Sequence, residues 1–490
     1  MTKIFLGCVA ALSLLSGLLY WTLPGKEGKR PIIYWITQDD VNKQAIVTTF
    51  HQWLADEGLP DVDLRIDNTN QDETKKLVQG VSGVGADIFD LYGHQMDLFQ
   101  ATGMLIDLTD DAKRLGFSPE ATYPGLRNDL VMQGRQYVFP RNAGVNLYFV
   151  NLATFAKLGV PPPPERWSSD EFEALGRRFV AAANPPGARQ RVYFTNGVSR
   201  DVLRRGLGLA NFNETGTRCT LDDPRNVEVL TRIRKWVVED HLFPSKEEDA
   251  AMAADITGVG SMFSHFTSGR FGMIFCGHWA FIMLRPRGHF EYAAVEPPQD
   301  GFPSTELGGG GIGVYAGTKH RKESIQFMQF LGSDQFNRLI VKIADSLPPV
   351  PRFAETEEFL HPVGRENEWP VNAAFAKATR ETGILASKSP FVLQSIVFRV
   401  ELETYEGVIA GRFTPAEGAR VMAERINAEI ADKVLHAPKL HALYEERLET
   451  QRRIEARRAE GRPVPAAWVT DAFHTAYYRA HGWLETEAKP

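Results

Sequence analysis

The chain has 490 residues, with 55 basic and 61 acidic side chains and a net charge of −6. Hydrophobic residues make up 43% and charged residues 24%, which is ordinary for a folded soluble protein, and the length suggests two to four domains. The mildly acidic balance gives no basis for nucleic-acid binding. Three cysteines are too few for a disulfide framework. Cys219 and Cys276 could pair in an oxidising compartment, but two unpaired thiols are the favoured interpretation.

The N-terminus carries an uncharged, mostly apolar run from Ile4 to Leu23. As a helix, this run would span about 30 Å, the thickness of a bilayer core. No clear small-residue cleavage site follows it, and the few apolar residues before Cys8 are short for a lipoprotein signal. The sequence therefore favours an uncleaved anchor or signal over lipidation. We expect the remaining chain to be periplasmic or extracytoplasmic, with residues 4–23 able to anchor it to the inner membrane.

Strands and helices alternate with short connections in the first hundred residues. The apolar patterns predict strands over 31–37, 62–66 and 87–92, each followed by a segment with helical spacing. This order is typical of a parallel sheet with right-handed crossovers, and so of an α/β fold.

A polar or aromatic group follows each of these three strands, at the edge of the sheet where open α/β folds bind ligands. The three groups are Gln38 with Asp39, Asn70 with Gln71, and Tyr92 with His94. Asp39 and Asp72 could instead serve only as helix N-caps. We expect some of these side chains to face a ligand.

Later segments extend the same pattern. Residues 137–151 read as one long extended segment that crosses between two lobes, and WSSDEF caps a helix over 169–183. Met273 to Cys276 are apolar without alternation, as in a strand buried on both faces, and Gly277-His278-Trp279 opens the next helix. Beyond residue 433 the chain is rich in arginine and glutamate and predicts a helical C-terminal extension.

Signals for an enzyme are weak. Residues 308–313 match G-x-G-x-x-G, but a strand rather than a helix follows, so a dinucleotide site is not expected. The sequence has no G-x-S-x-G or H-E-x-x-H motif, and His436 and His441 are poorly spaced for a metal. We expect no cofactor and no metal. A pair such as Asp39 and Asp87 could serve glycoside hydrolysis, which leaves a glycan-active hydrolase or lyase as an alternative.

Several short motifs occur in a characteristic order. They are DIF at 87–89, GMLIDLT at 103–109, YVFP at 137–140, LYFVN at 147–151, GVPP at 159–162, FTSGRFGM at 266–273, GHWA at 277–280 and EGVIAGRFTPAE at 406–417. In this order, over roughly residues 31–432, the chain resembles the maltose-binding-protein-like sugar-binding members of the extracellular solute-binding protein family 1.

The resemblance implies a two-lobed periplasmic-binding-protein type II fold with a hinge and an interlobe cleft. It places the first lobe at 31–143 with 277–343 and the second at 144–276 with 346–432, between an anchor and linker (1–30) and the C-terminal extension (433–490). It also places the crossings between lobes near Gly144–Phe149, Phe275–His278 and Asp345–Pro348.

The implied function is capture of a carbohydrate and its delivery to an ABC-type permease by a monomeric binding protein; a sensory receptor subunit is a further alternative. A flat aromatic ring such as Trp279 covers a sugar face, and polar side chains pair the hydroxyls. His278 and Arg141 could favour an anionic sugar or a sugar phosphate. The expected ligand-binding residues are Gln38, Asp39, Asn70, Gln71, Tyr92, His94, Arg141, Asn142, His278, Trp279, Gly309, Gly310 and Trp369.

Overall fold

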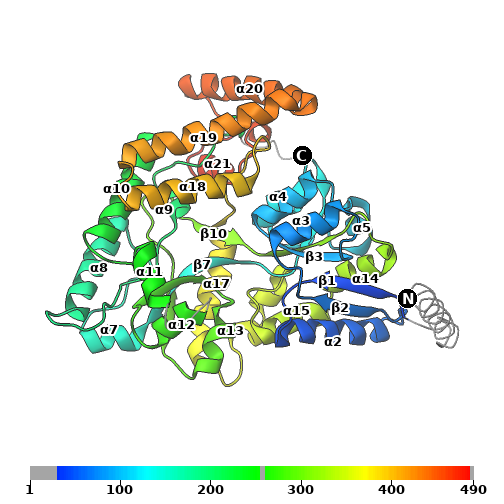
Figure 1. The fold of residues 1–490 in the computed structure, drawn as a ribbon, viewed down its shortest axis with the longest axis horizontal. Coiled ribbons are helices and arrows are strands. Elements are labelled where there is room, and N and C mark those ends of the chain that lie inside the picture. The colour runs from blue at the N-terminus through cyan, green and yellow to red at the C-terminus, as the bar shows by residue number, and fades with distance from the viewer. Residues whose placement is uncertain (1–29, 254–259, 486–490) are drawn as a thin grey trace, which may run out of the picture.

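The computed structural model describes residues 30–253 and 260–485, which form two α/β lobes and a helical C-terminal region (Figure 1). The apolar run expected to anchor the chain lies outside these residues. Within the described ranges, no helix has the length and apolar character needed to cross a bilayer.

The first lobe is built on a five-stranded sheet in the order β2-β1-β3-β11-β6. β1 is parallel to β2 and β3, whereas β11 runs antiparallel to β3 and β6. The strands are β1 (Ile32–Ile36), β2 (Asp63–Asp67), β3 (Ile88–Tyr92), β6 (Val138–Pro140) and β11 (Gly310–Val314). The principal helices of this lobe are α2 (Val41–Asp56), α3 (Glu73–Val81), α4 (His94–Ala101), α5 (Thr109–Leu115), α6 (Arg127–Leu130), α14 (Arg321–Leu331) and α15 (Asp334–Ile343).

Both faces of this sheet are covered, as its apolar strands predict. Trp35, Phe50 and Phe327 belong to one buried cluster, and Phe89 and Phe99 belong to another. Asp40 rather than Asp39 caps α2, and Asp72 caps α3. Gln38 and Asp39, and Asn70 and Gln71, come just before these two caps and lie at the carboxyl edge of the sheet.

The second lobe has its own sheet in the order β12-β10-β7-β8, with β9 also paired to β7. The strands are β7 (Gly144–Asn151), β8 (Met273–Gly277), β9 (Tyr292–Val295), β10 (Thr305–Gly308) and β12 (Gly383–Ile384). Its helices include α7 (Leu152–Leu158), α8 (Ser169–Ala183), α9 (Arg200–Gly206), α10 (Pro224–Val238), α11 (Lys246–Ala253), α12 (Gly260–Thr267), α13 (Ala280–Leu284), α16 (Glu357–Leu360) and α17 (Trp369–Glu381). The expected capping box is present at α8, between Ser168 and Glu171.

One predicted boundary is wrong. The resemblance placed residues 277–343 in the first lobe with a crossing near Phe275–His278, but β9 and β10 both pair with β7 in the second sheet. The chain instead crosses at Gly309, between β10 and β11, because β8 ends inside the second lobe and its backbone is paired there.

Three segments therefore join the lobes: residues 141–143 after β6, Gly309, and residues 345–347 after α15. The first and third are bonded to each other, since Ala143 N donates to Leu347 O at 3.0 Å and Leu347 N donates to Ala143 O at 2.8 Å. Ala344 and Ser346 have positive φ angles of 55° and 66°, which are uncommon for residues other than glycine. The surrounding contacts hold this backbone in a costly conformation.

The chain ends in helices that lie over the lobes at the top of Figure 1. They are α18 (Gln394–Ile409), α19 (Pro415–His436), α20 (Pro438–Ala459) and α21 (Ala472–Ala480). The expected helical C-terminal extension is confirmed, although α19 continues to His436, past the predicted boundary at residue 433.

Candidate functional site

Tyr92 lies at the carboxyl end of β3, next to the crossing at Gly309. Tyr92 is the last residue of β3, pairs with Gly310 of β11, and keeps 49% of its surface exposed. Its hydroxyl accepts a hydrogen bond from Arg141 Nη2 at 3.2 Å. Asp90 and burial of the hydroxyl raise the pKa of Tyr92, so the phenol is neutral and offers a flat face next to the crossing.

Polar side chains of the second lobe lie on the other side of this crossing. Asn146 Nδ2 donates to Glu306 Oε2 at 3.1 Å, and Ser199 Oγ donates to the other oxygen of Glu306. The indole of Trp279 lies over Gly277, whose backbone pairs with Asn146. Trp279 and Asn146 therefore share one face at the crossing end of β7.

Glu306 carries no ion pair with the described lysine, arginine or histidine residues. A carboxylate accepts about four hydrogen bonds, and the protein supplies two here. Its remaining lone pairs can accept from a ligand hydroxyl, in the charge-assisted bonds that are stronger than neutral ones. Sequence reasoning missed Asn146, Ser199 and Glu306; the available signal was that Glu306 stands just before the glycine-rich crossing.

The expected ligand residues Arg141 and Asn142 lie in a buried charge cluster at the crossings. Arg141 pairs with Asp345 and, at 3.4 Å, with Asp90 Oδ1, while Lys43 Nζ lies 3.3 Å from Asp345 Oδ2. Burial alone would raise the pKa of Asp345, but the charges of Arg141 and Lys43 lower it overall. The cluster ties the crossings together, and it leaves Arg141 only 2% exposed.

The two glycines expected to admit a ligand do lie at the crossing, but their immediate neighbours are protein atoms. Gly310 N donates to Asn142 Oδ1 at 2.7 Å, and a Cβ at Gly310 would lie 2.8 Å from Arg141 Nη2. A Cβ at Gly309 would overlap the carbonyl oxygen of Asn142. These glycines are needed for the close approach of two crossing segments.

The polar residues expected after β1 and β2 bond to groups near them in the chain. Asp39 Oδ1 accepts from Gln44 Nε2 at 2.6 Å, Asn70 Nδ2 donates to Asp67 Oδ2 at 2.6 Å, and Gln71 Nε2 donates to the carbonyl of residue 68 at 2.8 Å. Gln38 is exposed beside Asp39. These residues lie at the expected edge of the sheet, and no hydrogen bond among the described residues joins them to Tyr92.

His94 also lies at this edge, beginning α4 two residues after Tyr92. Its Nε2 is 2.8 Å from Glu73 Oε2, and its ring stacks on Phe398 of α18.

The structure separates His278 and Trp369 from this group. His278 is 2% exposed, contacts Asn372 Oδ1 through Nε2 at 2.8 Å, and is packed among phenylalanines. Burial lowers its pKa to about 4. Trp369 begins α17 and donates to the carbonyl of Pro362 at 3.1 Å. The neighbouring Asn367 bonds to Tyr292, which pairs with Asn151 at the end of β7 farthest from the crossing.

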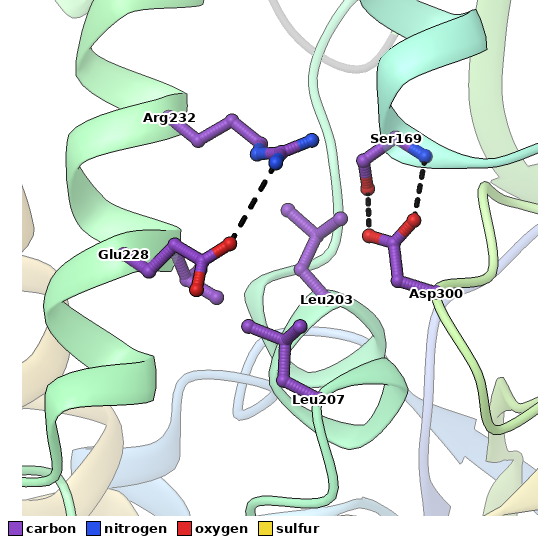
Figure 2. Close-up of a pocket in the computed structure, with 7 residues that line it drawn as sticks. Ser169, Leu203, Leu207, Glu228, Arg232 and Asp300 are labelled. Carbon is purple, nitrogen blue, oxygen red and sulfur yellow. Dashed lines mark hydrogen bonds and ion pairs between the residues drawn. The ribbon is translucent and has the colours of Figure 1, made fainter.

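Other crevices lie away from the crossings between the lobes. One lies between α8, α9 and α10, where Arg232 faces Glu228 and Ser169 bonds to Asp300 (Figure 2). Its volume is about 10 Å³, room for roughly one water molecule. A groove of about 350 Å³ lies between the start of α18 and the end of α19. In the part of the chain that the structure describes, no group of three or more histidine, cysteine, aspartate or glutamate side chains could hold a metal ion.

Two α/β lobes joined by three crossings, with polar and aromatic side chains beside the crossings, define a two-lobed solute-binding fold. A model of the bacterial extracellular solute-binding protein family matches residues 41–337, more than half of the chain. The chain belongs to this family. The resemblance noted from the motif order is thereby confirmed.

Solved structures share the fold at low sequence identity. An ABC substrate-binding protein of Listeria monocytogenes in complex with cycloalternan is 20% identical, with a TM-score of 0.69 over 82% of this chain and 100% of its own. A solute-binding protein of Thermotoga lettingae bound with α-D-tagatose is 16% identical, with a TM-score of 0.66 over 82% and 100%. UgpB of Mycobacterium tuberculosis in complex with glycerophosphocholine is 14% identical, with a TM-score of 0.66 over 83% and 100%. No curated protein sequence matches the chain.

Proposed function

We propose that this chain captures a carbohydrate between its two lobes and delivers it to an ABC-type permease. The family supports an extracellular solute-binding role, and several proteins of the same fold were solved with sugars. The observation that carries the proposal is the placement of Tyr92 on the first-lobe side of the Gly309 crossing and of Asn146, Glu306 and Trp279 on the second-lobe side.

These four residues suit a sugar for chemical reasons. Rigid aromatic rings cover the apolar face of a pyranose at low entropic cost. Glu306 and Asn146 offer acceptor and donor groups to the hydroxyls on its rim. The aromatic groups come from both lobes, so a ligand that touches Tyr92 and Trp279 together favours lobe closure about the crossings.

The site favours a neutral solute over an anionic one. Arg141 and His278 were expected to favour an anion, but Arg141 is paired with two carboxylates and His278 is buried and neutral at pH 7. The half-buried Glu306 carboxylate repels a ligand phosphate or carboxylate.

The proposed setting is outside the cytoplasm, with residues 4–23 as an inner-membrane anchor and the chain acting as a monomer. The permease is the proposed partner. A permease gene pair next to this gene would support delivery to a transporter, whereas a sensor kinase gene there would favour the receptor alternative.

A thermal-shift screen tests the binding function directly. The panel contains neutral sugars, polyols, sugar acids and sugar phosphates. A ligand at 100 times its dissociation constant should stabilise the protein by about 2.7 kcal/mol. Stabilisation by no member of the panel would contradict carbohydrate capture, and release of smaller products from an oligosaccharide would contradict pure binding.

A further inference from the structure

Lys388 joins the two lobes at a point separate from the three crossings. It follows β12 of the second lobe, and its Nζ lies 2.7 Å from Asp129 Oδ1 and 3.0 Å from Asp97 Oδ1. Asp129 lies in α6 and Asp97 in α4, both in the first lobe. All three side chains are at most 20% exposed, so solvent and salt screen this triad less than a surface pair.

An aromatic contact crosses the same boundary. The ring of Phe398, in α18, lies parallel to the imidazole of His94 in α4, with centroids 6.4 Å apart and planes 8° apart. His94 comes two residues after Tyr92, so this contact lies next to the candidate site. Figure 1 shows α18 extending from the second lobe toward α4 above the sheets. α18 therefore reaches the first lobe.

The C-terminal extension holds the loop that carries Lys388. Ser387 Oγ donates to Asp471 Oδ1 at 2.6 Å, and Asp471 is the N-cap of α21. On the other side of Lys388, Ser389 Oγ donates to the carbonyl of Gly216 at 2.6 Å. The loop is thus fixed by the extension directly at one end and by the second lobe at the other.

The second of these anchor points is itself held by the extension. Glu214, two residues before Gly216, accepts from Gln451 Nε2 at 2.8 Å and from Arg458 Nη1 at 3.1 Å. The hydroxyl of Tyr478 also donates to Glu214. Both α20 and α21 therefore fix the surroundings of the Lys388 loop, although the extension lies outside both sheets.

We propose that the C-terminal extension positions an interlobe brace, which keeps the unliganded protein in the arrangement of Figure 1. The brace consists of Lys388, Asp97, Asp129, His94 and Phe398. A rotation that separates α4 from α18 has to break the ion pairs and the ring contact together, and it would leave buried charges unpaired. The brace thereby gives the extension a role: it biases the lobe equilibrium before any ligand binds.

The test measures the distance between the lobes without ligand. Spin labels are attached to cysteines introduced by Lys113→Cys in α5 and Glu247→Cys in α11, both at exposed positions. The full chain is used, with Cys8→Ser to remove a native thiol. The distance between the labels is measured by pulsed electron resonance. The native Cys219 and Cys276 are buried, which shields them from the label. Lys388→Met should shift the distance distribution to longer values and broaden it. Asp97→Asn with Asp129→Asn should do the same from the first-lobe side.

Lys377→Met is the matched control, because Lys377 forms an exposed pair with Glu165 inside the second lobe, at 2.9 Å. It should leave the distribution unchanged. Wild-type distances in the folded brace variants would overturn the proposal, as would a widening in the control equal to theirs. Failure of both brace variants to fold would also overturn it, because the triad would then be a requirement of the fold. None of these outcomes depends on which solute the protein binds.

Discussion

Arg141 and Asp345 form a buried ion pair that fastens the first crossing between the lobes to the third. The two residues are 204 positions apart in the chain, and neither side chain is more than 7% exposed. Asn142 Nδ2 adds a hydrogen bond to Asp345 Oδ1 at 3.0 Å, and Lys43 brings a second cation from α2. The hinge region of this protein is therefore held by charge as well as by backbone pairing.

Asp345→Asn should destabilise the protein by about 3–5 kcal/mol, because it leaves Arg141 and Lys43 buried with too little negative charge. Chemical denaturation followed by tryptophan fluorescence measures the change. Glu358→Gln is the control, since Glu358 pairs with Arg338 on the surface, and it should cost no more than about 1 kcal/mol. Equal effects of the two substitutions would contradict the structural role of the buried pair.

Gly309→Ala should disturb the second crossing, whereas Gly308→Ala should not. A Cβ at Gly309 meets backbone atoms of Asn142 and Ala143, which cannot move away without shifting the crossing, while a Cβ at Gly308 has nothing within 4 Å. We expect a loss of about 2 kcal/mol or more for Gly309→Ala and a change within about 0.5 kcal/mol for Gly308→Ala. Thermal melting of both variants decides the matter, and a tolerant Gly309 would show that the crossings are less tightly packed than described.

The limits of sequence reasoning are clearest in β10. The strands β1, β2 and β3 are confirmed near their predicted positions, because their apolar patterns are local. No strand was predicted at β10, since its four residues carry no pattern of their own. It becomes a strand only because Leu307 pairs with Val145, 162 positions earlier. The resemblance placed this stretch in the first lobe, and the pairing of β10 with β7 places it in the second.

In the candidate site, too, some positions follow from local sequence pattern and others depend on contacts between distant residues. Tyr92 ends one predicted strand and Trp279 follows another, so their place at strand ends could be inferred from local pattern. Arg141 also follows a strand, but the sequence does not show that Asp90 and Asp345 neutralise it from 51 and 204 positions away. Glu306 was overlooked for the converse reason, because only the pairing of β7 with β10 brings it to Asn146.

Stability should fall between pH 6.5 and pH 4 because of His278. Its folded pKa of about 4 lies below the ordinary value of 6.5, chiefly through burial, with Arg285 also lowering it and the bond to Asn372 opposing. Its neutral form is therefore favoured in the folded state, and the unfolded chain takes up the proton first as the pH falls. The contribution is complete above pH 6.5 and shrinks by about 3 kcal/mol by pH 4. His278→Phe should lose less stability over this range, and parallel pH profiles would contradict the assignment.

Glu306→Gln should weaken sugar binding while leaving the fold intact. Glutamine keeps the shape and one acceptor oxygen, so the bond from Asn146 can persist, but the charge that strengthens bonds from ligand hydroxyls is lost. We expect affinity for the best neutral sugar of the thermal-shift screen to fall by about 1.5–3 kcal/mol in calorimetry. Trp279→Ala should cost about 1–3 kcal/mol in the same assay through the lost ring face. Glu424→Gln, on the exposed face of α19, is the charge-matched control and should bind as wild type. Unchanged affinity in both Glu306→Gln and Trp279→Ala would place the ligand elsewhere, whereas loss in Trp279→Ala alone would leave the ring in the site and remove the carboxylate from it.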